Sequence, residues 1–347
     1  MAGRARPRIR SYDMSHMARE AAEAPEAVER FLARNAHALS EIGARLRQTP
    51  PSVILTSARG SSDNAAGYFK YLAEILLGIP CCSIGASVVS IYGAELKVRG
   101  GLCVTISQSG KSPDIVALQD AARRAGAFTV ALVNVEDSPA AKAADICLPL
   151  HAGPELSVAA TKSFIVSLAA GAAIVAHWLG RADFLAAVSD LPDQLAKAAG
   201  IDWPEAVALA QKAESLYVVG RGPALPIAAE TALKLKETCA IHAEAYSIAE
   251  VMHGPLELLG EGYPVLAYSP DDQSRASSLE ALAKLRKTGA HVLVAEAGGL
   301  AFQPTLHPLL DPISIIQTAY RFVEATAQAR GRDPDRPRLL KKVTETV

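Results

Sequence analysis

Short apolar segments alternate with longer helical segments along most of this sequence, and this alternation limits the fold more than any other feature. The segments expected as strands are rich in Val, Ile, Leu and Cys and span residues 53–56, 81–84, 102–106, 129–133, 146–148, 216–219, 265–268 and 292–294. The segments expected as helices lie between them and include 63–77, 88–96, 115–125, 158–179 and 273–287. Apolar strands that alternate with helices are typical of βαβ units in parallel sheets. The sequence therefore predicts an α/β fold.

The predicted elements occur in two similar sets, which indicates an internal duplication. The segments VILTSARGSSDNAAGYFKYLAE (53–74) and LYVVGRGPALPIAAETALKLKE (216–237) each read as a strand, a glycine-containing turn and a long helix. The length of 347 residues also favours two domains, at roughly 100–200 residues per domain. We predict two doubly wound parallel sheets, each in an αβα sandwich. The expected parts are a disordered basic tail (1–19), a first domain (20–200), a second domain (201–330) and a C-terminal tail (331–347).

Charge and cysteine content exclude several classes of partner. Lys and Arg number 35 against 36 Asp and Glu, so no basic surface for nucleic acid or for an anionic membrane is expected. The five cysteines have no CxxC or zinc-like spacing, which indicates reduced thiols. The N-terminal arginines are not followed by the apolar segment that a secretory signal requires. The apolar run 164–180 is expected to be a buried helix. We predict a cytoplasmic protein with no nucleic-acid or membrane partner.

A serine-rich turn follows the apolar strand 102–106. Its candidate ligand-binding side chains are Ser107, Gln108, Ser109 and Ser112. Ser112 followed by proline is typical of a helix start, so the free N–H groups and hydroxyls should gather at a helix N-terminus, where anions bind. The segment lacks the GxxxxGK[ST] spacing of a Walker P-loop. An ordinary serine-rich turn remains the alternative.

A second turn of the same kind follows the first strand. Gly60-Ser61-Ser62 offers further donors, and the carboxyl ends of neighbouring parallel strands meet at one edge of a sheet. Two such loops favour a phosphate monoester as ligand. No GxGxxG follows any strand, so a dinucleotide site has no support.

The second half of the chain supplies ionisable groups. Glu230, Lys234 and Glu237 have helical spacing and share one face, although a salt-bridge ladder has the same spacing. Four residues downstream are possible metal ligands by type, but no HExxH or His-x-His pattern joins them, so a metal site is not expected there: His242, Glu244, Glu250 and His253. His253 precedes Gly-Pro at an expected helix end, so a structural helix cap is the alternative to a functional role for this residue. We expect no metal and no cofactor. A serine hydrolase is also disfavoured, since GxSxG is absent.

Several short motifs occur in a characteristic order along the chain. They are Gly60-Ser61-Ser62, Ser107-Gln108-Ser109-Gly110, Glu155 through Thr161-Lys162, Ala232 to Glu237, Ile241 to Tyr246, His253-Gly254-Pro255-Leu256 and the tail 337–344. With these motifs the chain resembles the sugar isomerase (SIS) domain family, from about residue 20 to the C-terminus. Within the family it is most similar to the isomerase half of glucosamine-6-phosphate synthase and to stand-alone glucosamine-6-phosphate deaminases.

The resemblance implies roles for individual residues. The residues implied in phosphate and sugar binding are Ser61, Ser62, Ser107, Gln108, Ser109, Ser112, Val158 and Lys234. Glu237 resembles the base that moves a proton between C1 and C2, and His253 resembles the ring-opening group lent by a neighbouring subunit. Lys342 resembles a tail lysine that meets the sugar carbonyl carbon, in a tail that closes the site. The tail has Lys341 where the synthases have a small residue.

The resemblance also implies a reaction. Only some fifty residues precede the first strand, and Ala2 stands where a synthase would begin with its nucleophilic cysteine, so we expect no glutaminase domain. Deamination of glucosamine 6-phosphate to fructose 6-phosphate and ammonia, by a homodimer with shared sites, is then the expected activity. The nearest alternatives are a galactosamine-6-phosphate deaminase/isomerase and a fructosamine-6-phosphate deglycase. The more distant alternative is a phosphosugar sensor without catalysis.

Overall fold

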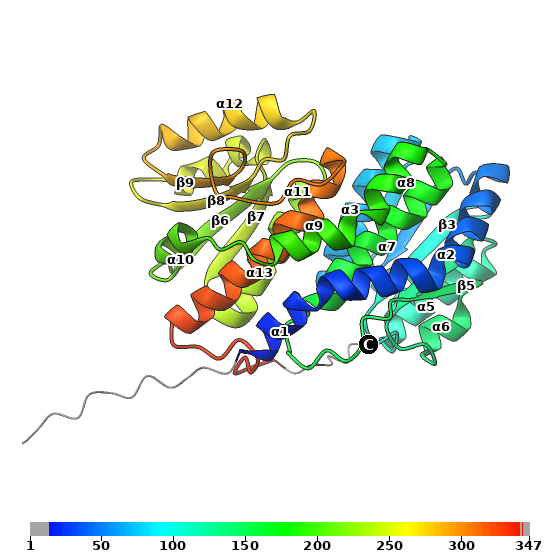
Figure 1. The fold of residues 1–347 in the computed structure, drawn as a ribbon. Coiled ribbons are helices and arrows are strands. Elements are labelled where there is room, and N and C mark those ends of the chain that lie inside the picture. The colour runs from blue at the N-terminus through cyan, green and yellow to red at the C-terminus, as the bar shows by residue number, and fades with distance from the viewer. Residues whose placement is uncertain (1–13, 341, 343–347) are drawn as a thin grey trace, which may run out of the picture.

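Two parallel sheets form the framework of the computed structural model, which describes residues 14–340 and residue 342 (Figure 1). The first sheet has the order β2-β1-β3-β4-β5 and the second the order β7-β6-β8-β9. The strands are β1 (Ile54–Ser57), β2 (Cys81–Ser83), β3 (Leu102–Ser107), β4 (Phe128–Val133), β5 (Ile146–Pro149), β6 (Ser215–Gly220), β7 (His242–Ser247), β8 (Pro264–Tyr268) and β9 (His291–Ala295). Every strand pairs in parallel with its neighbours. The predicted fold class is confirmed.

Helices surround both sheets and connect them. The α-helices are α1 (His16–Ala22), α2 (Ala24–Gln48), α3 (Ser61–Leu77), α4 (Ser87–Ser90), α5 (Pro113–Arg124), α6 (Pro139–Ala143), α7 (Lys162–Leu179), α8 (Ala182–Ser189), α9 (Leu191–Ala198), α10 (Pro204–Ala210), α11 (Ala224–Lys234), α12 (Arg275–Arg286) and α13 (Asp311–Ala329). A π-helix, η1 (Leu235–Cys239), continues α11, and 3₁₀ turns occur at η2 (Glu250–His253), η3 (Pro255–Leu258) and η4 (Pro308–Leu310).

The central strands of each sheet are buried on both faces, which explains their continuous apolar residues. In β3, Val104 and Ile106 face the core shared with α3 and α7, whereas Cys103 faces the opposite side, against Ala122 of α5. In β8, Leu266 packs into the large core and Val265 packs toward α12. Successive residues of a strand point to opposite faces, so a sheet covered on both sides needs apolar residues at every position.

Helix α7 lies at the centre of the large core. It is long and apolar enough to span a membrane by composition, but 89% of it is buried inside the protein. It packs against α2 and α3, while α11 of the second half packs against α3 (Figure 1). Helix-to-helix packing therefore joins the two sheets, and the predicted buried helix is confirmed with its start at Lys162 rather than at 158.

Three local predictions differ from the structure. Helix α1 begins at His16, inside the segment 1–19 that we expected to be disordered, and Met17 is fully buried; residues 1–13 lie outside the described residues. The helix expected over 88–96 is the single turn α4. Strand β7 was not predicted. It is an edge strand in which only Ala243 is fully buried, so its mixed polar and apolar residues lack the continuous apolar run of the other strands.

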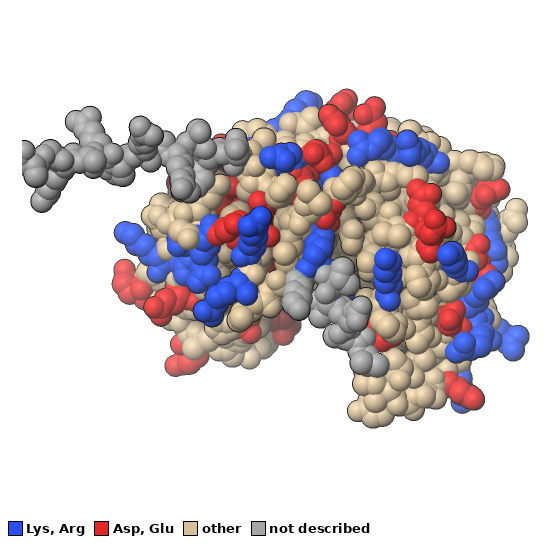
Figure 2. All heavy atoms as spheres, turned by 90° about the horizontal axis from the view of Figure 1, so that it is seen from below, with Lys and Arg blue, Asp and Glu red and all other residues tan. Residues whose placement is uncertain are grey.

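Charged side chains of both signs are interspersed on the face shown in Figure 2, without a large patch of one sign. The five cysteines are free: Cys81, Cys103 and Cys239 are buried, Cys147 is half-buried, and Cys82 is exposed. Burial raises the pKa of the Cys103 thiol to about 12, which keeps it protonated.

Candidate functional site

The two serine-containing loops lie side by side at one edge of the first sheet. Strands β1 and β3 are paired neighbours, with Ser57 opposite Thr105, and the loops follow their carboxyl ends. The guanidinium of Arg59, in the first loop, pairs with the buried carboxylate of Asp114, in the first turn of α5. The Ser57 hydroxyl also donates to the backbone oxygen of Ile115, at 3.3 Å. These contacts hold both loops together, as predicted from the strand order.

The second loop is shaped by its own serines and by a glycine. The Ser107 hydroxyl oxygen accepts a hydrogen bond from the N–H of Gly110 at 3.0 Å, and the Ser109 hydroxyl oxygen accepts one from the N–H of Lys111 at 3.3 Å. Gly110 has a φ of +61°, and a Cβ there would lie 2.2 Å from the hydroxyl oxygen of Ser138. Only glycine fits this position, so the loop is a tight turn with a fixed shape.

Three polar side chains of the two loops have no hydrogen-bond partner among residues 14–340 and 342. Within the described part of the chain, Ser62, Gln108 and Ser112 make no side-chain hydrogen bond, and all three are half-buried. Ser112 is the N-cap residue of α5 by position but does not cap with its side chain. Unpaired hydroxyl and amide groups near two helix N-termini suit a phosphate group.

A buried lysine connects this edge to the second half of the chain. The ammonium of Lys234 donates to the hydroxyl oxygen of Ser61 at 2.9 Å and to Oε2 of Glu237 at 2.6 Å. Lys234 also lies 3.3 Å from Oε1 of Glu230. Burial lowers the pKa of Lys234, but the two carboxylates outweigh burial and the pKa is raised. The ammonium of Lys234 therefore connects the first loop to Glu237.

Glu237 lies on the π-helix η1, where one extra residue widens the helical turn. Its side chain is 22% exposed, whereas that of Glu230 is fully buried. Glu237 also lines a cavity of about 600 Å³ with tail residues that include Arg338 and Leu339. The π-helix was not predicted, although the residue itself was. The Glu237 side chain is therefore partly exposed at the cavity, whereas Lys234 is buried.

A second group of side chains, which sequence reasoning missed, supports this arrangement. Asn64 of α3 donates to Glu230 Oε2 at 3.0 Å, and the hydroxyl of Tyr320 in α13 donates to Glu230 Oε1 at 3.2 Å. Burial and the negative charges of Glu230 and Glu155 raise the pKa of Tyr320 well above its ordinary value. No motif signals Tyr320, because it comes from a helix far along the chain.

The loop that precedes α7 meets the C-terminal tail. Glu155 is buried and accepts hydrogen bonds from the N–H of Thr161 at 3.1 Å and from the hydroxyl of Ser163 at 2.6 Å. The ammonium of Lys342 donates to the backbone oxygen of Ser157 at 2.6 Å and lies 3.6 Å from Glu155 Oε2. The tail therefore reaches the first half of the chain at Lys342. Lys341 and residues 343–347 lie outside the described residues.

Two predicted residues stand apart from these contacts. Val158 is half-buried in the loop after Ser157. His253 lies at the end of η2 and is exposed, and within the described residues it makes no hydrogen bond or ion pair with Glu237. The structure thus brings Ser61, Lys234 and Glu237 together but leaves His253 outside that cluster.

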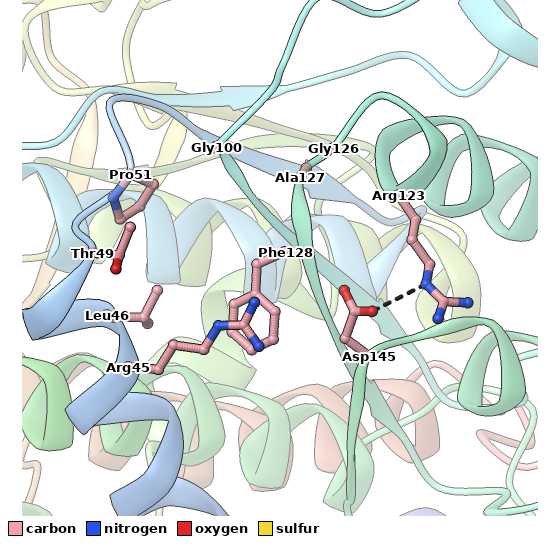
Figure 3. Close-up of a pocket in the computed structure, with 11 residues that line it drawn as sticks. Arg45, Leu46, Thr49, Pro51, Gly100, Arg123, Gly126, Ala127, Phe128 and Asp145 are labelled. Carbon is pink, nitrogen blue, oxygen red and sulfur yellow. Dashed lines mark hydrogen bonds and ion pairs between the residues drawn. The ribbon is translucent and has the colours of Figure 1, made fainter.

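Two other features bear on alternative sites. Within residues 14–340 and 342, no group of three or more His, Cys, Asp or Glu side chains could hold a metal ion. A cavity of about 390 Å³ lies beside Gly100 and Phe128, at the amino ends of β3 and β4 (Figure 3). The guanidinium of Arg45 lies 3.7 Å above the Phe128 ring, and Arg123 pairs with Asp145 at 3.0 Å. Ligands of parallel sheets bind at the opposite, carboxyl edge, and none of the predicted site residues lines this cavity.

Comparison with known proteins agrees with the motifs. The SIS domain model matches residues 50–177 and 209–295, together more than half of the chain. A glutamine–fructose-6-phosphate aminotransferase [isomerizing] from Zymomonas mobilis subsp. mobilis is 33% identical over 308 residues, which cover 82% of this chain and 50% of the relative. The chain therefore spans about half the length of the curated relatives it matches.

Solved structures give the same picture. A protein from Silicibacter pomeroyi DSS-3, proposed to be a phosphosugar isomerase, is 45% identical with a TM-score of 0.89, covering 93% of this chain and 100% of the other. A glucosamine-6-phosphate deaminase from Thermotoga maritima is 22% identical with a TM-score of 0.77, covering 96% of this chain and 100% of the other. The second similarity concerns the fold alone.

Proposed function

Because the chain belongs to the SIS domain family, we propose that it is an isomerising deaminase. It converts a 2-amino-2-deoxyhexose 6-phosphate to a ketose 6-phosphate and ammonia, and glucosamine 6-phosphate is the expected substrate. The observation that carries the proposal is the hydrogen-bonded series Ser61, Lys234 and Glu237. This series connects the sheet edge that carries the two serine-containing loops to the carboxylate of Glu237, which lines a cavity.

The reaction requires one proton to leave C2 of the open-chain sugar and one to be added at C1. This shift converts the 2-amino aldehyde into the 2-imine of the ketose. A carboxylate close to both carbons can perform both transfers, and we assign this role to Glu237. The buried Lys234 ammonium holds the carboxylate by a 2.6 Å hydrogen bond, which fixes its direction.

Ammonia leaves after the proton shift. Water adds to C2 of the imine, and the carbon–nitrogen bond breaks to give the ketone. This step needs no reactant besides water. We assign the phosphate to Ser62, Ser107, Gln108, Ser109 and Ser112, and the carbonyl end to Lys342, whose ammonium would stabilise negative charge on the sugar oxygen. A reducing, cytoplasmic location belongs to the same proposal, and the exposed free thiol of Cys82 supports it.

A product assay tests the proposal. Purified protein given glucosamine 6-phosphate should release ammonia and fructose 6-phosphate in equal amounts, with no loss of rate in EDTA. Galactosamine 6-phosphate and fructosamine 6-phosphate run beside it as alternative substrates. A preference for either would move the substrate to that sugar. Binding of all three without turnover would contradict an enzyme and favour a sensor.

The proposal includes a homodimer in which His253 of one subunit opens the sugar ring in the site of the other. His253 is exposed on η2, and Leu258 on the following turn is 65% exposed, as expected of a surface that a second copy covers. Mixing the inactive variants Glu237→Gln and His253→Ala should restore part of the activity, because one of the two mixed sites then has both groups. No recovery after confirmed subunit exchange would contradict shared sites.

A further inference from the structure

The second sheet contains its own cavity at the position that corresponds to the serine-rich loop of the first. The first sheet has the strand order β2-β1-β3-β4-β5 and the second has the order β7-β6-β8-β9. When the two orders are aligned, β6 corresponds to β1 and β8 corresponds to β3. The loop after β3 leads into α5, and the loop after β8 leads into α12. A cavity of about 600 Å³ lies at the carboxyl ends of β8 and β9, between Ser269, Glu296 and Phe302. This edge is where α/β sheets bind ligands.

One side chain in the cavity wall has an unmet hydrogen-bonding requirement. Ser269 is 2% exposed, and its hydroxyl has no hydrogen-bond partner within the described residues. Its backbone is fixed, because its N–H donates to the backbone oxygen of Ala295 at 3.2 Å. A buried hydroxyl without a partner is unfavourable, so a ligand that bonds to it would gain free energy.

A second wall residue has one oxygen free. Asp311 is 3% exposed, and its Oδ1 accepts hydrogen bonds from the N–H of Thr305 at 2.7 Å and from the Thr305 hydroxyl at 2.8 Å. No hydrogen bond to Oδ2 occurs within the described part of the chain. Burial raises the pKa of Asp311 to about 6, so the carboxylate still carries its charge near pH 7.

The cavity has an excess of negative charge. Its acidic residues are Asp271, Glu296 and Asp311, and its single basic residue is Arg275. Arg275 is already paired, at 3.6 Å with Asp271 and at 3.2 Å with Glu296. The carboxylate of Asp272 occupies the start of α12, where it accepts a hydrogen bond from the N–H of Ser274 at 2.8 Å. The position that a phosphate would take is therefore filled by a negative side chain.

The two corresponding loops thus favour opposite charges. The loop 107–112 contains no acidic residue, whereas the loop 269–274 contains two. We propose that the second cavity binds a small hydroxylated molecule with a primary ammonium group, such as an amino sugar without phosphate. The ammonium would bond to the carboxylates, a ligand hydroxyl would bond to Ser269, and the half-buried ring of Phe302 would contact the carbon skeleton.

Calorimetric titration of the full chain with glucosamine tests this inference, with glucose and glucose 6-phosphate as comparators. Glucosamine should bind at least about tenfold more tightly than glucose, because only glucosamine can form a charged hydrogen bond from an ammonium group to the carboxylates. Ser269→Ala and Glu296→Gln should each weaken glucosamine binding about tenfold. The matched control is Glu280→Gln, an exposed glutamate on α12 outside the cavity, which should leave the affinity unchanged.

The variants also separate this cavity from the proposed phosphosugar site. Glu237→Gln should leave glucosamine binding unchanged, whereas Ser269→Ala should leave ammonia release from glucosamine 6-phosphate unchanged. Equal binding of glucose and glucosamine would overturn the inference, as would glucosamine binding that survives both cavity substitutions. Loss of glucose 6-phosphate binding in Glu296→Gln would identify a phosphate site instead and would also overturn it.

Discussion

Replacing Glu237 with glutamine is expected to lower the turnover of glucosamine 6-phosphate by about 10²–10⁴-fold, the range usual for loss of a general base. The amide keeps the shape of the side chain, and its oxygen can still accept the hydrogen bond from Lys234 that the carboxylate accepts at 2.6 Å. It cannot take a proton from C2. The rate should therefore fall while the KM stays close to its original value.

Steady-state kinetics of ammonia release would measure this effect. Glu280→Gln is the matched control, because Glu280 is an exposed glutamate on α12, away from Glu237 and from His253. Turnover of Glu237→Gln within about tenfold of the original enzyme would show that another group moves the proton.

Replacing Lys234 with methionine is expected to destabilise the protein by about 3–5 kcal/mol, the cost of leaving a buried charge without its partner. Lys234 and Glu230 are both fully buried, and their charged atoms lie 3.3 Å apart. Without the ammonium, Glu230 keeps the neutral hydrogen bonds from Asn64 and Tyr320 but has lost its ion pair. Denaturant unfolding monitored by circular dichroism would measure the loss.

A double variant tests the cause of that loss. Glu230→Gln combined with Lys234→Met removes both buried charges and should recover much of the stability. Lys236→Met is the control, because Lys236 is exposed on η1, and its effect should stay within about 0.5 kcal/mol. A loss below about 1 kcal/mol in Lys234→Met alone would contradict the structural role assigned to this pair.

The sequence was informative wherever a residue's environment is local. The strands of both sheets follow from continuous apolar runs, except for β7, whose residues 242–247 mix charged and apolar types at a sheet edge. The pairing of the two serine-containing loops follows from adjacent parallel strands. The sequence correctly predicted that Ser112 lies at a helix start. It did not predict that the Ser112 side chain makes no capping hydrogen bond.

Other features depend on contacts between distant segments. Asn64 of α3 and Tyr320 of α13 both donate to Glu230, and no periodic pattern predicts such a meeting of distant helices. The π-helix at Leu235–Cys239 is a change of register inside a segment with ordinary helical spacing. The contact of Lys342 with Ser157 depends on the path of the tail across the molecule.

The central claim is that the serine-containing loops and Glu237 act on one sugar phosphate. The most direct measurement is a crystal structure of the protein with fructose 6-phosphate bound. We expect the phosphate within hydrogen-bond distance of Ser107, Ser109 and Ser112, with C1 and C2 of the sugar beside the Glu237 carboxylate. A phosphate bound elsewhere, or a sugar whose C1 and C2 point away from Glu237, would contradict it.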